Sequence, residues 1–75
     1  MTGEKVRELW RATPFQPFTM HLGDGRSFHV PHPEFFGMTR GGRLAVVMHG
    51  DEGMDIVDLL LVTSIELKPP SSSAA

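Results

Sequence analysis

The chain has 75 residues, of which 40% are apolar and 21% charged, and it has a formal net charge of -2 and no cysteine. This length holds one small domain, the composition is that of a folding globular protein, and the lack of cysteine excludes disulfides, thiolate nucleophiles and Cys-based metal centres. No apolar run approaches the roughly 20 residues of a membrane span, so we expect a cytoplasmic protein without membrane contact.

The first segment, residues 2–12, has the period of an amphipathic helix. Its apolar residues recur at positions i, i+3 and i+4: Val6, Leu9 and Trp10. Thr2 is a suitable N-cap residue, and Pro14 ends the pattern because the residue before a proline avoids the helical region. A helix of about three turns is marginal alone in water, so we expect its apolar side to pack on a sheet.

Two alternating segments, 18–22 and 27–30, predict a β-hairpin around Gly23-Asp24-Gly25. A two-residue loop would place apolar and polar residues on the same face. A three-residue turn with Gly25 in the left-handed region instead pairs Met20 with Phe28 and Phe18 with Val30. We therefore predict the second register, which leaves Thr19, His21, Ser27 and His29 together on the side of the hairpin away from the core.

The prolines of the segment 31–34 break the ladder and predict a corner of the sheet. A second hairpin follows, with residues 35–39 and 44–49 around Gly41-Gly42, and then a strand that begins at 54–57. Asp58 is suited to start a single 3₁₀ turn before a last strand over 62–67, although a continuous strand is the alternative. We expect residues 1–68 to form the domain and the polar residues 69–75 to be a disordered tail.

These elements predict an α+β domain, with an N-terminal helix followed by a strongly bent, about five-stranded antiparallel sheet of the small-barrel kind. Because layers bury their apolar sides together, one core is expected to gather six residues. They are Trp10, Phe18, Met20, Phe28, Val47 and Ile65.

The stretch His21-Leu22-Gly23-Asp24-Gly25-Arg26 and the order of the elements resemble Sm-type and SH3-like small barrels. That resemblance implies the fold. The resemblance does not extend to the two segments that contact RNA in Sm proteins. The corresponding segments of this chain, 36–40 and 58–63, do not have those motifs. The segments Pro14-Phe15-Gln16-Pro17-Phe18, Asp24-Gly25-Arg26, His32-Pro33-Glu34 and 58–66 resemble a family of short uncharacterised bacterial proteins, which implies no activity.

The residues offer little chemistry for catalysis or for a metal. The weak metal candidates are His29, His32 and Glu34, because without cysteine only a histidine and carboxylate set remains. The acidic residues of the segment 51–58 lack the loop pattern of an EF-hand. The sequence has no phosphate-cradling glycine motif, and neither Ser27 nor Ser64 has a neighbouring base. We therefore expect no enzyme and no cofactor.

Arginines fall at both predicted hairpin tips: Arg26, Arg40 and Arg43. If the two tips lie on one rim, they form a basic patch with the nearby Phe35 and Phe36, which is the minimum for binding single-stranded nucleic acid or an acidic peptide. The overall acidity disfavours that function, since broad electrostatic binding of nucleic acid usually needs a basic excess. A small-barrel nucleic-acid-binding protein is therefore the alternative function, and a metal-binding protein is less favoured.

The strand over 44–48 is apolar on both faces, whereas one short helix covers only one side of a sheet. An exposed apolar face indicates an interface, so the sequence predicts a homodimer or another protein-interaction and assembly module. The expected interface residues are Phe35, Leu44, Val46 and Met48. Closure of a barrel around these side chains is the competing interpretation.

Overall fold

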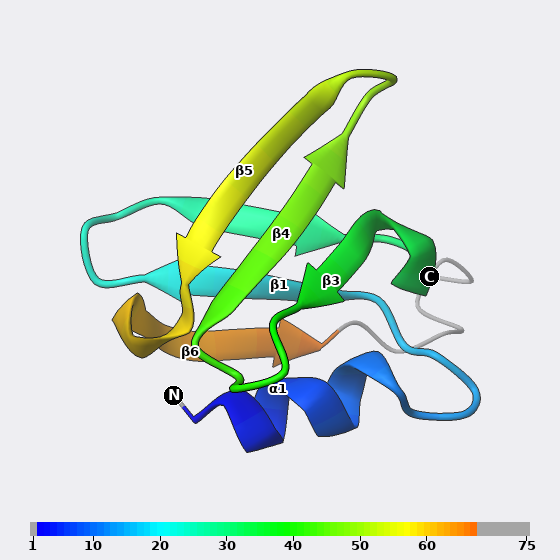
Figure 1. Cartoon of the computed structure of the whole chain (residues 1–75), viewed down its shortest axis with the longest axis horizontal. Helices are drawn as coiled ribbons and strands as arrows, with labels where there is room; N and C mark the ends of the chain where they lie inside the picture. Colours follow the sequence, from blue (N-terminus) through cyan, green and yellow to red (C-terminus); the bar gives the residue numbers. More distant parts are fainter. Residues whose placement is uncertain (1, 68–75) are drawn as a thin grey trace, which may run out of the picture.

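The computed structural model describes residues 2–67, which form one α-helix, six β-strands and two 3₁₀ helices (Figure 1). In chain order the elements are α1 (Gly3–Trp10), β1 (Phe18–Leu22), β2 (Ser27–Val30), η1 (Pro33–Phe35), β3 (Phe36–Met38), β4 (Leu44–His49), β5 (Gly53–Asp58), η2 (Leu59–Leu61) and β6 (Val62–Leu67). The predicted α+β class is confirmed, and the predicted helix has Thr2 as its N-cap residue.

The strands form two separate antiparallel sheets, with the strand orders β2-β1-β6 and β3-β4-β5. In Figure 1 the second sheet crosses in front of the first, and α1 runs along one side of the pair. The prediction of about five strands in one bent sheet of a small barrel was therefore wrong, because residues 2–67 form six strands in two sheets and no closed barrel. The reason lies at two breaks: the proline corner separates β2 from β3, and η2 separates β5 from β6.

The first hairpin has the predicted register, with Phe18 opposite Val30 and Met20 opposite Phe28. Gly25 has a φ of 95°, and its N–H donates to Leu22 O at 3.1 Å. Leu22 N–H donates in turn to Arg26 O at 2.9 Å. This is a three-residue turn whose last position favours glycine, because a side chain there would be strained.

The segment after β5 forms the predicted 3₁₀ turn rather than a continuous strand. Asp58 Oδ1 accepts a hydrogen bond from Leu60 N–H at 3.0 Å, which starts η2. The chain then crosses to the other sheet, where β6 pairs with β1, Met20 lying opposite Ile65. The ladder is irregular between His21 and Leu22, and Thr63 Oγ1 donates to His21 O there.

Eleven fully or almost fully buried apolar residues form the core between the sheets and α1. They are Val6, Phe18, Met20, Leu22, Val30, Phe36, Ala45, Val47, Val57, Leu59 and Val62. Of the predicted core, Phe18, Met20 and Val47 are buried, whereas Trp10, Phe28 and Ile65 are partly buried and pack against it. The aromatic rings of Phe18 and Phe36 join the two sheets edge to face, with centroids 5.6 Å apart.

Helix α1 is fixed to the turn between β3 and β4. Gly3 packs directly on the backbone of Gly42, so closely that a Cβ atom at Gly3 would overlap the Gly42 carbonyl oxygen. The Arg7 guanidinium donates to Thr39 O at 2.8 Å and to Arg40 O at 3.1 Å. This turn is therefore held in place from the helix side.

The described helix is too short and too polar to cross a membrane. The predicted disordered tail, 69–75, lies outside the described residues.

Candidate interaction surface

The side of the β3-β4-β5 sheet that points away from the core carries an exposed apolar surface. On β4 the alternate residues Ala45 and Val47 are buried, so the residues between them point outward. The register pairs Val46 with Ile56 and Met48 with Met54, which places these β5 residues on the same side. We call this surface the outer face; it consists of Leu44, Val46, Met48, Met54 and Ile56.

The exposure of the outer face is high for apolar side chains in a small protein. Ile56 and Met54 are 69% and 58% exposed, and Leu44 and Met48 are 39% and 36% exposed. Three of the four predicted interface residues, Leu44, Val46 and Met48, lie on this face. The competing interpretation placed Leu44 and Met48 inside a barrel, whereas here they lie on the outside of an open sheet.

Phe35, the fourth predicted interface residue, lies in η1 instead of a strand and is half-buried. It meets Met48 and Met54 around a hollow of about 370 Å³ at the end of the outer face. The rim of this hollow carries Glu34 and the turn between β4 and β5, with Asp51 and Glu52. The hollow therefore links the apolar outer face to a rim of three carboxylate side chains.

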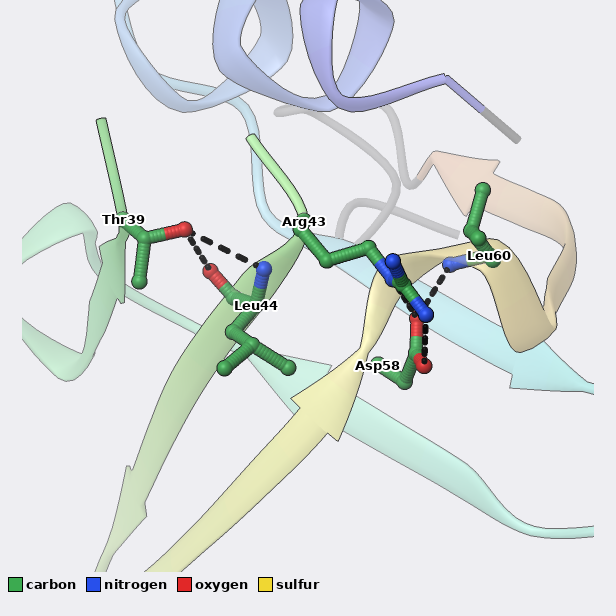
Figure 2. Close-up of polar contacts among 5 residues, drawn as sticks. All are labelled: Thr39, Arg43, Leu44, Asp58 and Leu60. Carbon is green, nitrogen blue, oxygen red and sulfur yellow. Dashed lines mark hydrogen bonds and ion pairs between the residues drawn. The ribbon is translucent and has the colours of Figure 1, made fainter. Parts of the chain in front are cut away.

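The opposite end of the outer face is fixed by a hydrogen-bond network (Figure 2). Arg43 Nε lies 3.1 Å from Asp58 Oδ1, and Arg43 Nη2 lies 3.3 Å from Oδ2, so the guanidinium binds both carboxylate oxygens. Beside this pair, Leu44 N–H donates to Thr39 Oγ1 at 3.2 Å, and the Thr39 hydroxyl donates to Leu44 O at 3.3 Å. Side chains therefore fix the start of β4 and the end of β5 relative to each other.

Because of this hydrogen-bond network, the stability of the folded protein depends on pH. The hydrogen bonds from Arg43, and then the one from Leu60 N–H, lower the pKa of Asp58 below its ordinary value of 3.8. Because the pKa is lower in the folded state, the stabilisation is fully present above the pKa of the unfolded chain. It is lost as the pH falls through the lowered pKa of the folded state. Arg26 lowers the pKa of Asp24 in the same direction, chiefly through its backbone N–H.

We predict that Asp58→Asn destabilises the protein at pH 7 and that the difference from the unmodified chain is smaller at an acidic pH below the ordinary pKa of 3.8. The asparagine retains an oxygen for Leu60 N–H but loses the charge that pairs with Arg43. Urea unfolding of both proteins at the two pH values measures this. Glu4→Gln is the matched control, since Glu4 is exposed on α1, away from the outer face, and has no ion pair within residues 2–67. An equal loss from Asp58→Asn at both pH values would contradict the role given to the charge.

The metal candidates are not brought together. His29 shares a hydrogen bond of 2.9 Å with Thr19, whereas the ring of His32 packs near Phe35, with centroids 5.8 Å apart. Glu34 lies at the rim of the hollow. Within residues 2–67 no three histidine or acidic side chains are grouped closely enough to hold a metal ion.

Two of the three arginines in the predicted basic patch are paired with carboxylates. Arg26 Nε lies 2.8 Å from Asp24 Oδ2, and Arg43 binds Asp58. Both hairpin tips contact η2. Leu59 N–H donates to Arg43 O, and Gly23 N–H donates to Leu61 O. A phosphate at Arg26 or Arg43 would compete with an existing partner, and nucleic-acid binding through these residues stays a prediction.

Met54 and Ile56 belong to the surface but were not among the predicted interface residues. The signal was present in the sequence, because alternation in 53–58 separates Ile56 from Asp55 and Val57. The sequence did not indicate which strand pairs with this segment. Only the register between β4 and β5 shows that Ile56 stands beside Val46.

No model of a known protein family, no curated protein and no solved structure matches this chain. The resemblances of its motifs to small barrels and to a bacterial family stay predictions.

Proposed function

We propose that this chain is a non-catalytic interaction and assembly module that associates with a second copy of itself through the outer face. The observation that carries the proposal is the exposed row of apolar side chains on β4 and β5, opposite the core side of the same strands. Contiguous exposed apolar patches on soluble proteins mark interaction sites. A domain of this size also gains stability by burying such a face against another chain.

A second copy is the favoured occupant because the centre of the face carries no charge. Val46 and Ile56 lie opposite each other in the register, and on the other side of Val46 stands Gly37, which has no side chain. An uncharged centre can meet its own copy about a twofold axis, because the same surface patch then contacts itself without bringing like charges together. A different protein partner would leave the purified chain monomeric.

We predict that Val46→Asp abolishes self-association, because the interface would then bury a carboxylate without a partner. Sedimentation velocity at tens of micromolar measures the effect. Leu61→Asp is the matched control, since Leu61 is 51% exposed and lies outside the outer face. The control is expected to associate like the unmodified chain. Equal association of Val46→Asp and the unmodified chain would overturn the proposal.

A second variant separates loss of the interface from loss of the fold. A Cβ atom added at Gly37 would have no heavy atom within 4 Å, so a side chain fits there without moving the core. Gly37→Lys is therefore expected to block the outer face and to unfold at the same temperature as the unmodified monomer, or slightly higher, since glycine weakens a strand. A dimeric Gly37→Lys protein would contradict the assignment of the outer face.

A further inference from the structure

The two ends of the outer face carry opposite charge. The β3–β4 turn contains Arg40 and Arg43, and the Arg7 guanidinium donates to its carbonyl oxygens. Asp58 balances Arg43, whereas Arg7 and Arg40 form no ion pair within residues 2–67. This end of the surface, which we call the basic end, therefore keeps positive charge.

The other end, which we call the acidic end, is the β4–β5 turn with Asp51 and Glu52. Glu34 from η1 stands at the same hollow. None of these three carboxylates has an ion pair within the described part of the chain, whereas Asp55 is paired with His49 at 2.8 Å. Strand β4 runs from one end to the other, and its six residues cover about 20 Å.

The apolar part of the surface is small for a specific dimer. Strands about 20 Å long and about 5 Å apart give β4 and β5 a footprint of roughly 200 Å². Stable interfaces commonly bury about 800 Å² on each partner. The contact must therefore extend beyond the apolar centre to the turns at both ends, where the charges lie.

We propose that the two copies pack face to face with their β4 strands antiparallel, so that the basic end of each copy meets the acidic end of the other. This inference rests on the proposed self-association and adds its geometry. The antiparallel arrangement places Arg40 near Asp51 and Glu52 of the second copy, twice in one closed pair. A parallel arrangement places like charges together, which complementary interfaces avoid.

Charge-reversed variants test the arrangement. Arg40→Glu alone, and Asp51→Lys with Glu52→Lys together, are each expected to raise the dissociation constant of the homodimer by about 10-fold or more, because like charges then face each other. An equimolar mixture of the two proteins is expected to associate more tightly than either alone, because in the mixed pair an acidic end faces a basic end at both contacts. The decisive contact is between the glutamate at position 40 of one chain and the lysines of the other.

The readout is the weight-average mass from sedimentation equilibrium, for each variant and for the mixture at the same total concentration. Arg11→Glu is the matched control, because it makes the same charge change at the end of α1 that lies away from Gly42. It is expected to associate like the unmodified chain.

The outcomes separate the geometry from the proposed function. If the reversed variants dimerise as strongly as the unmodified chain while Val46→Asp is monomeric, the antiparallel arrangement is wrong and the outer face stands. If association of the mixture is no tighter than that of its components, the pairing of the two ends is wrong. If the unmodified chain is monomeric, both proposals fail.

Discussion

Phe18→Ala is expected to lower the free energy of unfolding by about 4 kcal/mol, because large-to-small changes of buried aromatic residues leave a cavity that the core fills only in part. Phe18 is fully buried on β1, and its ring contacts the ring of Phe36 on β3 and the ring of Phe15, with centroids 5.6 and 5.9 Å apart. The substitution therefore removes an aromatic contact between the two sheets. A domain of this length has a total stability of roughly 4 to 11 kcal/mol, so much of the variant is expected to be unfolded at 37 °C.

Urea unfolding at one fixed protein concentration measures this loss, with Phe18→Leu as the control. Leucine keeps most of the apolar volume and is expected to cost roughly 1 to 2 kcal/mol. A loss below about 1 kcal/mol for Phe18→Ala would show that the two sheets do not share this core.

Trp10→Ala is expected to cost about 3 kcal/mol and to lower the melting temperature by more than 10 °C. The Trp10 ring packs edge to face on Phe36, with centroids 5.5 Å apart, and its Nε1–H donates to Pro33 O at 3.0 Å. Both contacts join the last turn of α1 to the chain around η1 and β3. Without them α1 keeps the buried Val6 and the Arg7 hydrogen bonds, but its last turn loses its aromatic contact with the sheet.

Trp10→Phe separates the two contributions, because it keeps an aromatic ring against Phe36 and removes the hydrogen bond. We expect it to cost about 1 kcal/mol, since water can replace the donor at an exposed carbonyl. Thermal unfolding followed by circular dichroism measures both variants. An unchanged melting temperature for Trp10→Ala would mean that the helix is not docked on the sheets.

Local structure could be predicted where one residue type decides the backbone. Gly25 fixed the register of the first hairpin, because only the turn with a left-handed residue keeps Met20 and Phe28 on one face. Asp58 marked the start of η2 because a short carboxylate can accept the N–H two residues later. A two-residue loop at Gly25 would have placed apolar and polar residues on one face of the hairpin. A continuous strand at Asp58 would have lost the hydrogen bond that Leu60 N–H donates to its carboxylate.

The division into two sheets could not be predicted, because it depends on pairing between distant strands. Residues of β1 pair with residues of β6 that come 40 or more positions later, and no local pattern marks that partner. The run Leu59-Leu60-Leu61 is uniform in sequence, yet only Leu59 is buried. Likewise, the pairing of Arg43 with Asp58 depends on the β4–β5 register, which is why a free basic patch was predicted there.

The mass of the unmodified chain in solution tests the role of the outer face most directly. Light scattering after size exclusion, at tens of micromolar, is expected to give twice the 8.3 kDa of one chain and to fall toward one chain on dilution. A closed twofold pair leaves no second copy of the face free, so the mass is not expected to rise further. A mass of 8.3 kDa at every concentration would contradict self-association through Val46 and its neighbours.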